Sequence, residues 1–229
     1  MEQNPRIALV TGGSNGIGSA IAARLASGGF RVVIADIEPP HDTQENIIFQ
    51  YCDVTSGADV DSLYNMVTQT VGTPTIVVIN AGRGIHELLA EGDPEKWQQV
   101  VDLNIMGALR CIRSFVPLLL SNKKGDVVFI SSVSSTKPYT YGAVYGATKA
   151  ALDNIAETLR LETAPHLRVT VVRAGITDTD FFRKTGRGDD IGNSALEAKD
   201  IAEDVWYAIN KPKGTAINAI VTRPHGQEF

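Results

Sequence analysis

The sequence predicts an α/β fold, in which helices cover both faces of a doubly wound parallel sheet, as a single domain over residues 1–229. Short apolar runs alternate with longer segments of helical periodicity along the whole chain. These runs are continuously apolar, which is typical of strands that are buried on both faces. The length suits one domain, and a composition of 43% hydrophobic and 21% charged residues is that of an ordinary globular chain.

The first half of the chain predicts four strands and two helices. The run at 6–11 stops at glycines, as a buried strand does, and the helix expected after it ends at Gly28 and Gly29. Strands are expected at 6–11, 31–36, 47–54 and 75–82, and helices at 16–27 and 56–72. Right-handed crossovers would bring the carboxyl ends of these strands to one edge of the sheet, where ligands bind in such folds.

The second half begins with a helix whose start is well marked. Asp93 before Pro94 is an N-cap followed by proline at the first helical position, so one long helix is expected over 94–121. Further strands are expected at 125–132, 167–175 and 217–224, and further helices at 144–163 and 198–210. The polar, glycine-bearing stretch at 183–198 is long for a loop in this fold, and we expect a substrate loop or lid over 180–198.

Composition excludes several classes of function. A net charge of −5 with no polybasic block argues against nucleic-acid binding. The N-terminus lacks the pattern of a signal peptide and the apolar runs are too short to span a bilayer, so we expect no membrane association and a cytoplasmic location. Cys52 and Cys111 are expected to be small buried hydrophobes, and four widely spaced histidines predict no metal site.

A glycine-rich turn follows the first expected strand and opens the first expected helix. Gly12, Gly16 and Gly18 leave room for a pyrophosphate at the helix N-terminus, where free N–H groups favour anions. Ser14 and Asn15 could add polar contacts to the phosphates. The spacing differs from G-x-G-x-x-G, so a purely structural turn is the alternative.

Asp36 closes the second expected strand, 18 residues after Gly18. A carboxylate at this place can accept hydrogen bonds from the adenosine ribose hydroxyls and would repel the 2′-phosphate of NADP. No lysine or arginine lies in the following residues to neutralise such a phosphate, so the sequence favours NAD over NADP. The alternative is an aspartate that only shapes the turn.

Three motifs together give a resemblance to a known family. With TGGSNGIG at residues 11–18, NAG at 80–82 and Tyr145-x-x-x-Lys149, the chain resembles the short-chain dehydrogenases/reductases over nearly its whole length. The resemblance implies a Rossmann fold and hydride transfer between a nicotinamide cofactor and an alcohol or ketone.

The resemblance also implies roles for individual residues. Asn104, Ser132, Tyr145 and Lys149 look like the catalytic tetrad. The expected cofactor-binding residues are Gly12, Ser14, Asn15, Gly16, Ile17, Gly18, Asp36, Asp53, Val54, Asn80, Ala81, Gly82, Tyr145, Lys149, Gly175, Thr177 and Thr179. One departure concerns the turn after the sixth strand, where the family usually has Pro-Gly and this chain has Ala174-Gly175, which leaves the turn less restricted.

Tyr145 and Lys149 lie one helical turn apart, on the same face of an expected helix. A phenol has an ordinary pKa of about 10, so it is a poor base at neutral pH. An ammonium roughly 4 Å away favours the phenolate by about 4 kcal/mol at an effective dielectric constant of about 20, which predicts a lowered pKa for Tyr145. Tyr145 would then act as the general acid or base. The alternative is an ordinary exposed polar pair.

Ser132 and Asn104 complete the expected site. Ser132, 13 residues before Tyr145, matches the family spacing and could stabilise charge on the substrate oxygen, whereas Ser131 should face the other side of its strand. In the family the backbone carbonyl of Asn104 holds a water bonded to the lysine. The alternative is a core asparagine that bonds only its neighbours.

The sequence therefore favours an NAD-dependent oxidoreductase acting on a small alcohol, ketone or hydroxy acid, in a homodimer or homotetramer. Loop cations such as Arg83, Arg183, Lys184 and Arg187 could pair with an anionic substrate, although such residues are usually only solvated. Two alternatives stay open: an NADPH-dependent 3-oxoacyl-thioester reductase with an acyl-carrier partner, and a catalytically idle NAD-binding regulator.

Overall fold

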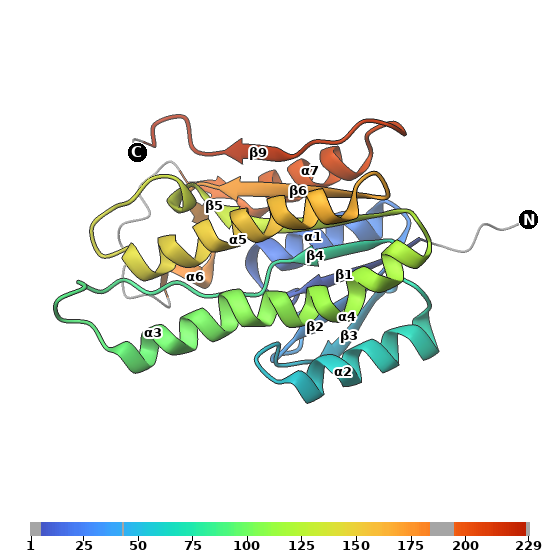
Figure 1. Cartoon of the computed structure of the whole chain (residues 1–229), viewed down its shortest axis with the longest axis horizontal. Helices are drawn as coiled ribbons and strands as arrows, with labels where there is room; N and C mark the ends of the chain where they lie inside the picture. Colours follow the sequence, from blue (N-terminus) through green and yellow to red (C-terminus); the bar gives the residue numbers. More distant parts are fainter. Residues whose placement is uncertain (1–5, 43, 184–194, 228–229) are drawn as a thin grey trace, which may run out of the picture.

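A seven-stranded parallel sheet forms the centre of the molecule, as the computed structural model shows for residues 6–42, 44–183 and 195–227 (Figure 1). The strand order is β3-β2-β1-β4-β5-β6-β9. The strands are β1 (Arg6–Thr11), β2 (Phe30–Asp36), β3 (Ile47–Tyr51), β4 (Ile76–Ile79), β5 (Gly125–Ser132), β6 (Leu167–Ala174) and β9 (Ala219–Thr222). The chain therefore adds strands outward from β1 on one side and then from β4 on the other, so strand order reverses between these two strands, as the doubly wound prediction requires.

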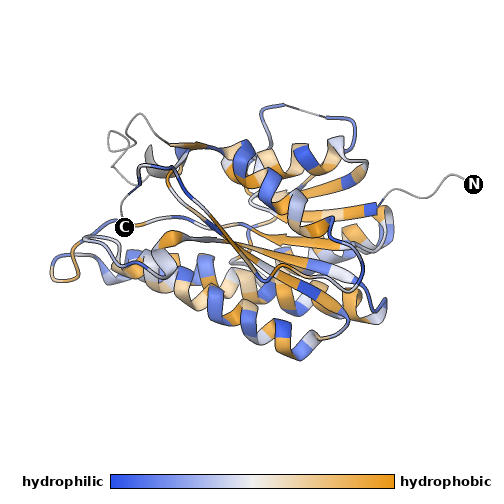
Figure 2. Cartoon of the chain, turned by 90° about the horizontal axis from the view of Figure 1, so that it is seen from above, coloured by the Kyte–Doolittle hydropathy of each residue, from blue (hydrophilic) through white to orange (hydrophobic). Residues whose placement is uncertain are grey.

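Helices cover both faces of this sheet (Figures 1 and 2). The regular helices are α1 (Gly16–Ser27), α2 (Gly57–Met66), α3 (Pro94–Val101), α4 (Ala108–Ser121), α5 (Ala143–Thr163), α6 (Asp180–Arg183) and α7 (Ala198–Ile209). Two π-helical segments, η1 (Val67–Val71) and η2 (Asp102–Gly107), and one 3₁₀ turn, η3 (Val133–Ser135), complete the set. The Asp93 carboxylate accepts from Glu95 N (2.9 Å), so the expected N-cap of α3 is confirmed.

Two hydrophobic clusters fill the spaces between the sheet and the helices. Phe115, Leu119 and Leu152 of α4 and α5 belong to the cluster on one face, together with Phe129 of β5. Ile21 of α1 and Ile201 of α7 belong to the cluster on the other face. Because both faces of the sheet are covered, the continuously apolar strands are explained.

Several expected boundaries are wrong in detail. The strand expected at 75–82 ends at Ile79, because Asn80 N donates to the Thr11 hydroxyl (3.0 Å). The strand expected at 47–54 ends at Tyr51, because Asp53 turns the chain by accepting from Thr55 N (2.9 Å). The helix expected over 94–121 is interrupted by η2. Four short elements were not expected: α6, η3, β7 (Thr177–Asp178) and β8 (Leu196–Glu197), the last two of which pair in parallel. Most of the expected lid, residues 184–194, lies outside the described residues.

Among the described residues, one helical stretch, Pro94–Ser121, is long and apolar enough to cross a membrane by length and composition alone. Core helices of soluble proteins pass the same test, and Cys111, Phe115 and Leu119 on this stretch pack into the core beneath the sheet.

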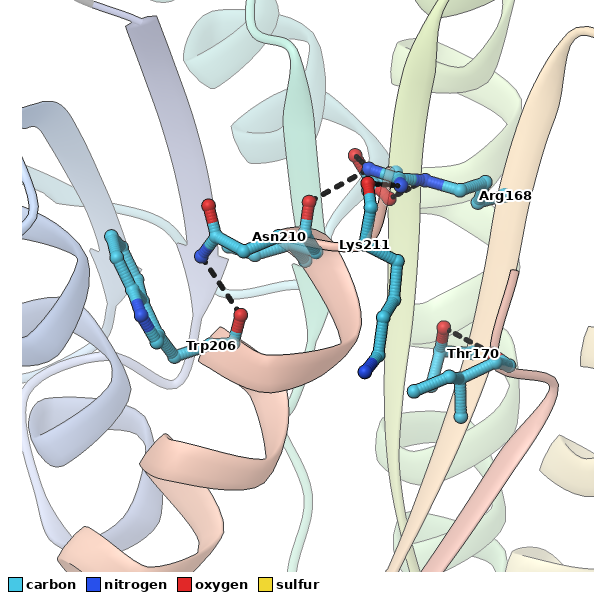
Figure 3. A network of polar contacts seen from close by, with 8 residues as sticks. Arg168, Thr170, Trp206, Asn210 and Lys211 are labelled. Atoms are coloured by element: carbon cyan, nitrogen blue, oxygen red, sulfur yellow. Dashed lines mark hydrogen bonds and ion pairs between the residues drawn. The ribbon is translucent and has the colours of Figure 1, made fainter. Parts of the chain in front are cut away.

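Arg168 joins the sheet to the end of α7 (Figure 3). Its guanidinium makes two hydrogen bonds to the Asp126 carboxylate (2.7 and 2.9 Å). It also donates to the carbonyls of Ile209 (2.7 Å) and Lys211 (2.9 Å), which satisfies the exposed end of the helix. One side chain therefore ties β5, β6 and α7 together.

Candidate active site

A cavity of about 1350 Å³ lies at the carboxyl ends of the strands. Its lining comes from the glycine turn after β1, the ends of β2, β4, β5 and β6, and the start of α5. Every residue expected in the site lines this cavity except Ser14 and Asn104. The predicted cofactor-binding and catalytic residues, which lie far apart in the sequence, therefore line the same cavity.

The N-terminus of α1 faces this cavity through Gly16, Ile17 and Gly18. No side chain caps the helix at Asn15, and its first turn holds no acidic residue, so no acidic residue of the helix itself offsets the positive end of its dipole. Gly16 has φ of +53°, which favours glycine, and a Cβ on Gly18 would collide with the carbonyl oxygen of Gly12. The glycines thus let the chain fold tightly around an anion-binding helix end.

Asp36 lies at the rim of the cavity, where two backbone amides hold its carboxylate. Ser14 N donates to one oxygen (3.0 Å) and Glu38 N to the other (3.3 Å). The Ser14 side chain is buried, and its hydroxyl donates to the Glu38 carbonyl (2.6 Å). Ser14 therefore braces the turn against the end of β2, and its hydroxyl points away from the place where phosphate contacts were expected.

Asn80 connects the two strands between which the strand order reverses. Its side-chain amide donates to the carbonyls of Thr11 (2.9 Å) and Gly12 (2.8 Å). The Thr11 hydroxyl in turn accepts from the backbone amides of Asn80 and Ala81. This network fixes the glycine turn relative to β4, and leaves Ala81, Gly82, Asp53 and Val54 along the wall of the cavity.

Tyr145 and Ser132 meet at the end of β5, where α5 begins. Both side chains are mostly buried, and the Ser132 hydroxyl interacts with the phenol. Ser132 also donates to the Ser134 hydroxyl (3.1 Å) and accepts from Ser134 N (3.2 Å). Ser131 turns to the other side of its strand, toward the Lys149 carbonyl (3.5 Å), as the strand alternation predicts.

Lys149 is buried one turn further along α5. Its ammonium donates to the Ile130 carbonyl (2.9 Å) and lies 5.8 Å from the centre of the Tyr145 ring. Burial lowers the pKa of Lys149 to about 8, and the nearby Asp153 carboxylate acts in the opposite direction. The side chain reaches the cavity but is held by the backbone of β5.

The pKa of Tyr145 is shifted in the direction opposite to the one expected. Burial raises the pKa of the phenol well above its ordinary value, and the Ser132 hydroxyl only partly offsets this. The expectation rested on the attraction between a nearby ammonium and the phenolate. In the structure the loss of water around the phenol is the largest influence on its pKa, because desolvation disfavours the charged phenolate.

Asn104 is fully buried in η2, behind the cavity wall. Its side-chain oxygen accepts from Arg83 N (2.9 Å), and its nitrogen donates to the Arg83 carbonyl (3.0 Å) and to the Thr148 hydroxyl (3.0 Å). The side chain therefore joins the segment after β4 to α5, whereas the role that the resemblance implies belongs to the backbone carbonyl of the same residue.

The segment after β6 forms the remaining wall. Thr177 is buried and its hydroxyl donates to the Gly175 carbonyl (3.0 Å), while Thr179 packs beside Gly16, where an added Cβ would lie 3.3 Å from the threonine side chain. Phe181, His86 and Tyr139, which lie in the three segments that the sequence predicts around the substrate pocket, also line the cavity. The Phe181 ring lies near the Tyr145 ring (5.5 Å between centroids, with the planes tilted by 54°), and His86 contacts the Tyr139 hydroxyl (2.8 Å).

The residues present fit a nicotinamide dinucleotide. The uncapped end of α1 suits a pyrophosphate, the held carboxylate of Asp36 suits ribose hydroxyls, and the phenol of Tyr145 lies at the other end of the same cavity.

Comparison with known proteins identifies the family of the chain. The family model described as short chain dehydrogenase matches residues 6–190. An uncharacterized oxidoreductase of Staphylococcus epidermidis is 32% identical over 228 residues, which cover 96% of this chain and 97% of the relative.

Two solved structures show the same architecture. The closed form of a serine dehydrogenase complexed with NADP+ has a TM-score of 0.90 at 26% identity, covering 97% of this chain and 96% of that one. A 3-ketoacyl-(acyl-carrier-protein) reductase of Brucella melitensis complexed with NADH has a TM-score of 0.87 at 25% identity, covering 95% and 96%. The chain belongs to the short-chain dehydrogenase family, and it is an oxidoreductase with the Rossmann fold of that family.

Proposed function

We propose that the protein transfers a hydride between NAD(H) and a small alcohol or ketone, hydroxy acids included, with Tyr145 as the general acid and base. The observation that carries this proposal is the convergence of Tyr145, Ser132 and Lys149 on the cavity that Asp36 and the N-terminus of α1 also line. A nucleotide pocket alone would not need a proton-transferring group at its far end.

The chemistry divides between cofactor and chain. When bound, the dinucleotide supplies the nicotinamide carbon that gives or accepts the hydride. In reduction, the Ser132 hydroxyl donates a hydrogen bond to the substrate carbonyl oxygen, and the phenol of Tyr145 gives its proton to that oxygen. In oxidation the step runs in reverse, and the substrate hydroxyl gives its proton to the phenolate form of Tyr145. Burial keeps the phenol protonated at neutral pH, so the side chain is ready to act as the acid.

Lys149 supports the proton transfer electrostatically. Its pKa of about 8 leaves it charged at neutral pH, where the ammonium stabilises negative charge that develops on the phenol oxygen. Asn104 holds α5 against the segment after β4, which keeps Tyr145 and Lys149 in place.

The preference for NAD over NADP rests on Asp36. Two backbone amides hold its carboxylate at the rim of the cavity, where a like-charged 2′-phosphate at about 4 Å would cost on the order of 4 kcal/mol at an effective dielectric constant of about 20. The two related structures are bound to NADP+ and NADH respectively, so they support a nicotinamide dinucleotide of either kind.

Two alternatives are distinguishable. A 3-oxoacyl-thioester reductase, which the name of the Brucella relative supports, predicts NADPH and an acyl-carrier partner. An idle NAD-binding regulator is disfavoured by the presence of all four tetrad residue types. We also propose a cytoplasmic homodimer or homotetramer, supported by exposed apolar side chains on two helical segments, Met106 of η2 (42% exposed) and Leu161 of α5 (65%).

A screen of substrates tests the proposal. The purified protein is incubated with small alcohols, hydroxy acids, their ketones and one 3-oxoacyl thioester, with NAD(H) and NADP(H) in parallel, while the absorbance of reduced nicotinamide is followed. Turnover of an alcohol or ketone with NAD(H) is expected. Turnover restricted to the thioester with NADPH would favour the reductase, and dinucleotide binding without any turnover would favour the regulator.

A further inference from the structure

The C-terminal tail reaches back over the segment that follows β6. β9 pairs in parallel with β6, and beyond it residues 223–227 form a turn in which Gln227 N donates to the Pro224 carbonyl (3.0 Å). Arg223 donates from its guanidinium to the Gln227 carbonyl (2.6 Å), which closes the turn. Gln227, half-buried, lines the cavity from this position.

The Gln227 side chain makes a specific contact there. Its carbonyl oxygen accepts a hydrogen bond from Ile176 N (3.1 Å). One residue earlier, Gly175 N donates to the Thr222 carbonyl (2.7 Å). Two successive amides of the segment are therefore bound by the C-terminal part of the chain, the second of them by a side chain.

Close packing accompanies these hydrogen bonds. A Cβ atom at Gly175 would lie 2.5 Å from the Gln227 side-chain oxygen and 2.7 Å from Arg223 Cα, so only glycine lets the tail approach this closely. On the other side, the Ile176 carbonyl accepts from Leu196 N (2.9 Å), and Thr177 pairs with Leu196 in the small sheet. The segment is thus held between the tail and β8.

Thr177 depends on this arrangement. Its buried hydroxyl bonds back to the Gly175 carbonyl, so the orientation of the 175–177 turn sets the position of the threonine in the cavity wall. The turn lacks the ring constraint of a proline, because Ala174 precedes Gly175. The conformation of this turn is instead restrained by its hydrogen bonds to the C-terminal tail and to β8.

We propose that Gln227 is a positioning residue, which clamps the Gly175–Thr177 turn through the Ile176 amide and so fixes the wall against which the dinucleotide binds. The expected effect on dinucleotide binding rests on the proposed function. The hydrogen bond between Gln227 and the Ile176 amide does not, because it is present in the protein without any cofactor. It adds the C-terminal tail to the binding site, although Gln227 lies 51 residues beyond its partner in sequence.

Three variants test the clamp. Gln227→Ala removes the acceptor, Gln227→Glu keeps an oxygen at the same place, and His225→Ala alters an exposed residue of the same turn without touching the contact. Amide hydrogen exchange of the peptide containing Ile176 is measured in the protein without cofactor. The dissociation constant for NADH is measured by calorimetry, and thermal unfolding verifies that each variant is folded.

For Gln227→Ala we expect Ile176 exchange to be faster by roughly fivefold and the NADH dissociation constant to rise by roughly the same factor, since one neutral hydrogen bond is lost. Gln227→Glu should retain the slow exchange, and His225→Ala should match the wild type in both measurements. Unchanged exchange in a folded Gln227→Ala variant would overturn the clamp, and faster exchange with an unchanged dissociation constant would overturn its positioning role. If the wild type bound no dinucleotide at all, the proposed function would fail while the exchange measurement still decided the clamp.

Discussion

Burial shifts the pKa values of Tyr145 and Lys149 in opposite directions and moves them apart, from ordinary values that are nearly equal. The pKa of the Tyr145 phenol is raised above its ordinary value, and the pKa of the Lys149 ammonium is lowered to about 8, because each group loses contact with water. The ion pair of phenolate and ammonium is therefore not the resting state of the site. Charge or hydrogen bonding that is added within the cavity has to oppose this separation before the phenol can give up its proton.

The pKa of Lys149 makes a prediction about stability. An amine whose pKa is about 8 in the folded protein and about 10.4 when unfolded binds fewer protons in the folded state between these values, so stability rises with pH in this window. Relative to Lys149→Met, the wild type should gain about 2 kcal/mol in free energy of unfolding between about pH 7 and about pH 10. Urea unfolding of both proteins at the two pH values measures this difference, and parallel pH dependences would contradict the burial of a titrating amine.

Asp36 makes a prediction about cofactor choice. Asp36→Ala removes the charge that would oppose a 2′-phosphate, so the preference for NAD over NADP in kcat/KM should fall by at least roughly tenfold. Asp42→Ala, at an exposed acidic residue after the same strand, is the matched control and should leave the ratio unchanged. If Asp36→Ala also left the ratio unchanged, the carboxylate would not determine the preference.

At the scale of single elements, the helical stretch from Pro94 to Ser121 shows how a local irregularity serves the site. Its middle part, η2, is π-helical, and Asn104 within it makes three side-chain hydrogen bonds to Arg83 and Thr148. π-Helical turns often occur at functional sites. Here the turn carries the amide that ties the segment after β4 to α5.

Replacing this amide should loosen that connection. Asn104→Ala should lower the free energy of unfolding by about 2 kcal/mol, because a buried side chain with three hydrogen bonds is lost. Asn65→Ala, at an exposed position of α2, should change it by less than about 0.5 kcal/mol. Chemical denaturation compares the two variants, and equal effects would mean that the η2 network contributes nothing to stability.

At the scale of the whole molecule, Arg168 connects the neighbouring strands β5 and β6 to the end of α7. It pairs with Asp126 on β5 and with two carbonyls at the end of α7 (Figure 3). Burial raises the pKa of Asp126, and Arg168 is the main influence that opposes this shift.

Arg168→Met should therefore destabilise the protein strongly, by about 3 kcal/mol, since it leaves a largely buried carboxylate and two helix-end carbonyls without their partner. Arg160→Met removes an exposed ion pair with Glu157 and should have a much smaller effect. Thermal unfolding of both variants measures the contrast. A loss in Arg168→Met no larger than in Arg160→Met would contradict this account of the connection.

Much of this architecture could be predicted from the sequence, because strand and helix periodicities, glycine turns and the Asp93 cap are local signals. The π-helical η2 could not, since its residues satisfy the ordinary helical pattern equally well. The direction of the Ser14 hydroxyl depends on the Glu38 carbonyl, and the role of Gln227 depends on an amide 51 residues away. The raised pKa of Tyr145 follows from burial on all sides, which spacing along one helix does not reveal.

The most direct measurement of the central claim compares Tyr145→Phe with Tyr141→Phe. Tyr141 lies in the same stretch but is exposed and outside the cavity wall, so it is the matched control. Rates of NADH oxidation with a ketone substrate and the NADH dissociation constant are measured for both variants. Tyr145→Phe should lower kcat by on the order of a thousandfold, with little change in NADH affinity, and Tyr141→Phe should retain activity. Full turnover by Tyr145→Phe would show that another group transfers the proton.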